Sequence, residues 1–171
     1  IRAAVRRGEW SDALDASLRA IVSHPIGPDA CHAELLLQTA EIAALADARS
    51  IAKSSALAAL NAVSGSSRRH HSVAARSHRV LAHLAAADGK LTEAWKAISR
   101  ALAISADQKP DKLVTATHLA VAALIKPNQD GSLVGAAARV LGVRGDAVYA
   151  AILDYADWYL AAGRPSEALH L

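Results

Sequence analysis

A seven-residue pattern recurs three times along the chain. Each copy reads glycine, two variable residues, a hydroxyl residue, an acid, alanine and a large apolar residue. The copies occupy residues 8–14, 89–95 and 163–169, and each follows an apolar run of helical character. Internal repetition of this kind predicts an all-α fold, an α-α superhelix in which antiparallel helix pairs stack into a solenoid.

The repeated pattern also marks helix boundaries. Its glycine lies just after a helical run, where a left-handed C-terminal residue is favoured. The hydroxyl residue three positions later is a candidate N-cap of the next helix, and these residues are Ser11, Thr92 and Ser166. The predicted helices are 1–7, 11–24, 29–46, 48–63, 71–88, 92–106, 111–126, 132–143, 146–162 and 166 onward. No stretch alternates with period two for long enough to predict a strand.

We expect one domain over residues 1–171, built of repeats at 1–25, 29–63, 71–106, 111–143 and 146–171. Gly8 and Gly89 lie 81 residues apart, which is two repeats, and Asp47 occupies the corresponding turn between them. Ala52 follows Asp47 by five positions, as Ala13 follows Gly8. Both chain ends fall within helical patterns. We therefore expect a segment of a longer solenoid, whose exposed ends favour self-association.

Composition narrows the class of protein further. Apolar residues make up 53% of the chain but aromatic residues only 4%, and alanine supplies much of the difference. Small side chains allow helices to approach closely. Cys31 is the single cysteine, so a reducing, cytoplasmic location is expected. No run reaches the roughly 18 apolar residues of a membrane span, and no membrane partner is expected.

The repeated pattern and the residues around it resemble those of the tetratricopeptide repeat superfamily. Ala13, Ala94 and Ala168 match the small residue that this family places where two helices touch, and Pro25 matches the proline that closes a repeat. The repeats run near 40 residues rather than the family's 34. The resemblance implies a groove lined by the first helix of each pair. Longer, degenerate repeats of this kind also resemble those of bacterial regulators of the maltose-activator type.

Three basic residues share one face of a predicted groove helix. Arg76, Arg79 and His83 fall three and then four positions apart. One interpretation of this arrangement is capture of an acidic peptide or of a C-terminal carboxylate. The alternative is internal pairing, because Glu34 and Glu41 share one face of the preceding first helix.

Other candidate sites are weaker. Trp158 is the aromatic residue expected to anchor a partner. The basic stretch 68–71 lacks interleaved aromatic residues, so nucleic acid is not an expected partner. The spacing of His71, His78 and His83 does not suit a metal site, and no metal or cofactor is expected. No phosphate loop or nucleophile elbow occurs, so an enzyme is not predicted.

The leading prediction for function is a protein-protein interaction scaffold within a larger intracellular protein or assembly, which binds a peptide or partner subunit through the helical groove. The alternative is the sensor arm of a bacterial transcription regulator of the maltose-activator type. A nucleotide-binding module before this segment, or a helix-turn-helix after it, would favour the regulator. The fold predicts a general role and does not identify a partner.

Overall fold

The computed structural model describes residues 9–23, 30–64, 70–107, 112–125, 142–144, 147–148, 150–153 and 156. In these residues the chain is helical and forms no strand, so the all-α class is confirmed for this part of the protein. The helices are α2 (Trp10–Ser23), α3 (Ala30–Leu45), α4 (Arg49–Val63), α5 (His71–Ala87), α6 (Leu91–Asp107) and α7 (Lys112–Ile125). Each agrees with its predicted range to within one residue at both ends.

Several sequence predictions lie outside the described residues. They are the helix at 1–7, residues 132–141 of the helix at 132–143 and the helix from 166 onward, together with Pro25, Ser166 and Ala168. Residues 142–143 are described and are not helical, so the predicted end of that helix is wrong, and Gly142 has φ +65°, which is not a right-handed helical conformation. Of the helix predicted at 146–162, the described residues 147–148, 150–153 and 156 are helical.

The predicted N-cap of α6 is wrong by two positions. The amide of Ala94 donates to the carbonyl of Lys90 at 2.9 Å, so Lys90 and not Thr92 precedes the first helical residue. The reason is the tight turn, in which the amide of Lys90 already donates to the carbonyl of Ala85 at 2.8 Å. The helix therefore begins directly after Lys90. Ser11 likewise lies inside α2 and does not cap it.

The turn between α5 and α6 is closed by backbone hydrogen bonds. Gly89 has φ +73°, the left-handed region that glycine adopts most easily. Its amide donates to the carbonyl of Ala86 at 2.9 Å, next to the bond from Lys90 to Ala85. These two bonds form a Schellman motif, which satisfies carbonyls at the end of a helix. Gly89 is therefore a helix C-terminal residue, as predicted, whereas Gly8 and Gly163 lie outside the described residues.

The turn between α3 and α4 has the same geometry without a glycine. Asp47 has φ +54° and donates its amide to the carbonyl of Ala44 at 3.4 Å. The amide of Ala48 donates to the carbonyl of Ala43 at 2.8 Å. Asp47 and Gly89, which are 42 residues apart, thus occupy equivalent positions in two equivalent turns. The prediction that Asp47 lies at the corresponding turn is confirmed.

An exposed arginine connects these two turns. Arg49 Nε donates to Asp47 Oδ1 at 2.8 Å, and Arg49 Nη1 donates to Asp88 Oδ1 at 3.1 Å. Carboxylates beside a guanidinium favour its charged form, and they raise the pKa of Arg49, with Asp47 contributing more than Asp88. Equivalent ends of the two helix pairs are thereby joined, although exposed ion pairs add little stability.

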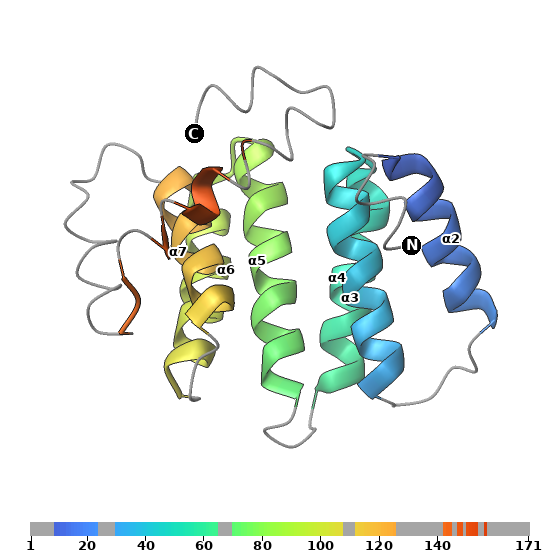
Figure 1. Ribbon diagram of the computed structural model, residues 1–171, viewed down its shortest axis with the longest axis horizontal. Coiled ribbons are helices and arrows are strands. Elements are labelled where there is room, and N and C mark those ends of the chain that lie inside the picture. The colour runs from blue at the N-terminus through green and yellow to red at the C-terminus, as the bar shows by residue number, and fades with distance from the viewer. Residues whose placement is uncertain are drawn as a thin grey trace.

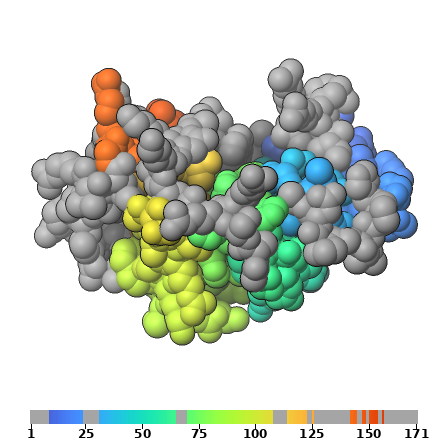
Figure 2. Space-filling model, turned by 90° about the horizontal axis from the view of Figure 1, so that it is seen from below, coloured from blue at the N-terminus to red at the C-terminus, as the bar shows by residue number. Residues whose placement is uncertain are grey.

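From α2 to α7 the chain progresses along the long axis of the molecule, and α3 overlaps α4 and α7 overlaps α6 in the view of Figure 1. The space-filling view shows the colours running in the same direction, from blue through green to yellow (Figure 2). Each helix packs against the next one, from α2 through to α7. In addition, α3 contacts α5, and α5 contacts α7. These three helices form the α3–α5–α7 row, with α5 at its centre.

Small side chains fill the contacts between helices. Four buried positions on α4 recur 42 residues later on α6, namely Ala52 and Ala94, Ala56 and Ile98, Ala59 and Ala101, and Val63 and Ser105. Ala94 is 0% exposed, so its predicted place at a helix–helix contact is confirmed. Two hydrophobic clusters, one centred on α3 and α4 and the other on α6 and α7, meet at α5. None of the described helices has the length and apolarity that a membrane crossing requires.

Candidate functional site

Buried polar contacts occur at three helix–helix interfaces of the described chain. Ser17 on α2 and Thr39 on α3 lie 2.5 Å apart through their hydroxyl oxygens. The hydroxyl of Ser105 on α6 lies 3.2 Å from Nδ1 of His118 on α7. The third and largest contact joins α3 to α5, and it contains two of the residues predicted to bind a partner.

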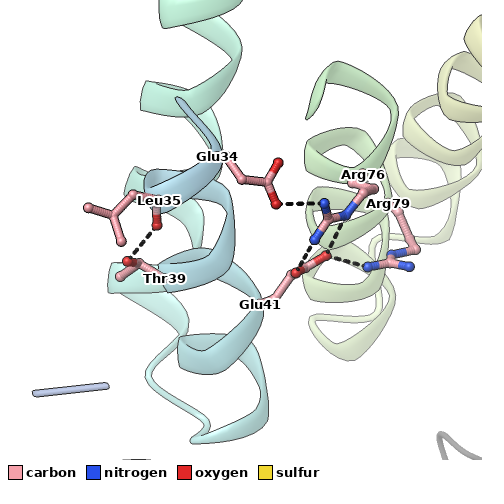
Figure 3. Close-up of polar contacts among 6 residues, drawn as sticks. All are labelled: Glu34, Leu35, Thr39, Glu41, Arg76 and Arg79. Atoms are coloured by element: carbon pink, nitrogen blue, oxygen red, sulfur yellow. Dashed lines mark hydrogen bonds and ion pairs between the residues drawn. The ribbon is translucent and has the colours of Figure 1, made fainter. Parts of the chain in front are cut away.

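That contact is a network of four charged side chains, Glu34 and Glu41 on α3 with Arg76 and Arg79 on α5, here called the Glu–Arg network (Figure 3). Arg76 donates from Nε and Nη2 to Glu41 at 3.2 and 2.7 Å, and from Nη1 to Glu34 at 2.8 Å. Arg79 donates from Nη2 to Glu41 at 2.5 Å. Glu41 therefore accepts hydrogen bonds from both guanidinium groups.

Helical periodicity places the side chains of each helix in this network on one face. Glu34 and Glu41 are seven residues apart, about two helical turns, so both carboxylates leave α3 on one side. Arg76 and Arg79 are three residues apart and share a face of α5. Because α3 packs directly on α5, the acidic face of one helix meets the basic face of the other.

Burial and charge oppose each other at Arg76. Burial alone lowers the pKa of the Arg76 guanidinium, but the negative charge and hydrogen bonds of Glu41, followed by those of Glu34, outweigh it and leave the pKa raised. A buried charge of this kind is stable only with its partner in place. The Glu–Arg network therefore sets the position of α5 against α3.

Exposure is uneven across the network. The side chain of Arg79 is 11% exposed and that of Glu41 is 23% exposed, whereas that of Glu34 is 37% exposed. Arg76 lies between them at 22%. The network thus has a buried end at Arg79 and a solvent-facing end at Glu34.

His118 is a further buried polar residue, on helix α7, which packs against α5. It was not identified as a candidate from the sequence. It is 0% exposed on α7. Burial, followed by the positive charges of Arg79 and Arg76, lowers the pKa of His118 to about 3, so the ring is neutral at neutral pH. The available signal was its position, because His118 is the one ionisable residue within the apolar stretch 113–125.

The predicted partner-binding residues therefore have different surroundings. Arg76 and Arg79 are paired internally, which was the alternative to a free basic face. His83 is half-buried on the same helix and has an interaction partner. Trp158 lies outside the described residues. Whether any of these residues contacts a partner stays a prediction.

The remaining chemistry of the described chain is sparse. Within it, no group of three or more His, Cys, Asp or Glu side chains is arranged to hold a metal ion. Of the basic stretch, residues 68–69 lie outside the described residues and His71 begins α5. Comparison of the chain with protein-family models, curated proteins and solved structures finds no match.

Proposed function

We propose that this chain is a tetratricopeptide-like helical-repeat segment that acts as a protein-interaction scaffold. The observation that carries the proposal is the equivalence of the turns at Asp47 and Gly89. Two helix pairs of similar length, with the same turn geometry and several equivalent buried positions, behave as repeated units. Each unit adds one helix to the α3–α5–α7 row, so successive units extend the row along the chain.

The packing order of the helices supports the same proposal. In α-α solenoids the first helix of a pair contacts its own partner, the preceding second helix and the neighbouring first helices. Here α5 contacts α6, α4, α3 and α7, so it has every neighbour that this arrangement requires. We propose that the partner binds along the α3–α5–α7 row, with Arg76, Arg79 and His83 as candidate contacts. Trp158, which lies outside the described residues, stays a further candidate contact.

A pair of photo-crosslinking positions tests this function. Gln38 is half-buried on α3, between Glu34 and Glu41, whereas Lys53 is exposed on α4, outside the row. A photoreactive residue at position 38 should crosslink to a discrete protein in cells that express the chain, and the same residue at position 53 should not. Equal crosslinking at both positions, or crosslinking at position 38 to nucleic acid alone, would contradict the scaffold proposal.

A further inference from the structure

The two carboxylates of the Glu–Arg network are held very differently. Glu41 accepts three hydrogen bonds, two from Arg76 and one from Arg79. Glu34 accepts one, through a single oxygen, from Arg76 Nη1. Glu34 is also the most exposed member of the network. Because water screens an exposed ion pair, the bond from Arg76 to Glu34 is the easiest one to exchange.

The charge balance of the network indicates which kind of ligand could replace Glu34 at Arg76. With Glu34 in place, two arginines and two glutamates balance. If Glu34 swings away, Arg76, Arg79 and Glu41 carry one net positive charge, and Arg76 Nη1 becomes a free donor at the solvent-facing end. An anionic oxygen is the ligand that such a donor binds most strongly.

We propose that Arg76 Nη1 is a carboxylate-binding position, which Glu34 occupies in the free protein and a carboxylate of a bound acidic peptide takes over. This inference rests on the proposed function, since it places the site on the α3–α5–α7 row. Glu41 keeps its bonds to Arg76 and Arg79 during the exchange, so the contact between α3 and α5 persists. Glu34 then acts as an internal competitor that weakens binding of the partner.

The site suits a single carboxylate better than a chain of phosphates. Glu41 lies directly beside Arg76, with its Oε2 2.7 Å from Nη2. A DNA strand holds its phosphates on one backbone and would bring several of them against this second carboxylate, whereas the flexible side chains of an acidic peptide need to place only one carboxylate where Glu34 was. The carboxylate of a peptide comes from an acidic side chain or from the C-terminus, and the probe peptides separate these two sources.

The test measures peptide affinity by fluorescence anisotropy. The first probe is fluorescein-labelled hexaglutamate with an amidated C-terminus. The second is hexaglutamine with a free C-terminal carboxylate, and the third is hexathymidine DNA. The variants are Glu34→Gln, Arg76→Gln and the double variant. The matched control is Glu93→Gln, because Glu93 is an exposed acid on α6 and its loss changes the net charge by the same amount.

Removing the internal competitor should raise the affinity for hexaglutamate about fivefold, because a larger fraction of the protein is then competent to bind. Glu93→Gln should change it less than about twofold, since that charge is remote and screened. Addition of Arg76→Gln to Glu34→Gln should abolish the gain. A gain for hexaglutamine instead of hexaglutamate would assign the same position to a C-terminal carboxylate.

Three results overturn the inference. They are equal gains from Glu34→Gln and Glu93→Gln, a gain that survives loss of Arg76, and an equal gain for hexathymidine. Absence of hexaglutamate and hexaglutamine binding to every variant overturns it as well. Each variant is also melted, and Glu34→Gln should shift Tm little because Arg76 keeps Glu41. Crosslinking at position 38 is independent of these probes, so the scaffold proposal can stand when this inference fails.

Discussion

The pairs α3–α4 and α5–α6 share their turn geometry and several buried positions, but one buried position is apolar in the first pair and charged in the second. Several positions 42 residues apart have matching exposure, as in Ala33 and Ala75 at 1% and 2%, and Ala40 and Ala82 at 0%. At another such position α3 has Leu37, which is 0% exposed, and α5 has Arg79, which is 9% exposed. A charged side chain therefore occupies a place that the preceding pair fills with leucine.

This difference separates the residues that define a helix pair from the residues that determine which helix packs beside it. The turn geometry and four buried alanines recur in both pairs, so they specify the unit but not its neighbour; in the first pair these alanines are Ala33, Ala40, Ala52 and Ala59. Arg79 requires a carboxylate from the adjacent helix, and Glu41 of α3 supplies it. Removal of either Arg79 or Glu41 leaves the other charge without its partner in a low-dielectric environment. The helix α5 is therefore most stable when it packs beside α3.

The largest expected effect comes from Glu41→Gln. This change removes the carboxylate that both Arg76 and Arg79 share, and we expect it to lower the free energy of unfolding by about 3 kcal/mol. Arg79→Leu, which copies Leu37, should cost less, because Arg76 still holds Glu41. Urea denaturation of both variants measures the difference.

The opposite order of these two variants in their loss of unfolding free energy would contradict this prediction. A greater loss from Arg79→Leu would mean that the packing of the Arg79 stem matters more than the pairing of its charge. Glu93→Gln is the control for loss of one acidic group, and its effect should stay within about 0.5 kcal/mol, as for most surface changes.

The second prediction tests whether the two pairs are packed equivalently. Ala52 and Ala94 are both 0% exposed and follow their turns by five residues. Ala52→Leu and Ala94→Leu should each overpack a helix contact and cost about 1–3 kcal/mol. Ala103→Leu, at an exposed position on α6, is the control. If Ala94→Leu is tolerated and Ala52→Leu is not, the equivalence of the pairs does not extend to their cores.

The third prediction concerns the pH dependence of stability that is caused by His118 on α7. His118 titrates near pH 6.5 when the chain is unfolded and at about 3 when it is folded. As pH falls below 6.5, the unfolded chain binds a proton that the folded chain does not, so stability is lost. Between pH 7 and 5 this amounts to about 2 kcal/mol.

His118→Gln isolates this contribution, because glutamine retains a hydrogen-bonding group near Ser105 and does not titrate. The variant should show a shallower fall in stability between pH 7 and 5 than the wild-type chain. Burial, followed by the charge of Arg100, also lowers the pKa of His78, which therefore adds a slope of the same sign to both proteins. Parallel curves for the two proteins would show that His118 does not control this region.

The helices were predictable from sequence because their signals are local. Glycine after an apolar run, an alanine at a fixed distance and helical periodicity define the ranges of α2 to α7 without knowledge of the partners. The equivalence of Asp47 to Gly89 also followed from spacing alone. The N-caps of α2 and α6 were misplaced, and at α6 the reason is that Lys90 takes part both in the turn and in the first hydrogen bond of the helix.

The site was predictable only as a pair of alternatives. Arg76 and Glu34 are 42 residues apart, and whether they meet depends on how α3 and α5 rotate and tilt against each other. Periodicity gives the face of each helix but not that rotation. The burial of His118 likewise depends on packing, because a histidine in an apolar helix is compatible with either a surface or a core position.

The smallest expected effect distinguishes the two turns. Gly89→Ala meets no atom within 4 Å of the added Cβ, so its cost is the left-handed backbone alone, about 1 kcal/mol. Asp47→Gly relieves similar strain, but it loses the ion pair with Arg49 and gives the unfolded chain more freedom. These effects oppose each other, so stability should change by less than about 0.5 kcal/mol. If thermal denaturation showed a clear gain from Asp47→Gly, Asp47 would be a strained substitute for glycine rather than a compensated equivalent of it.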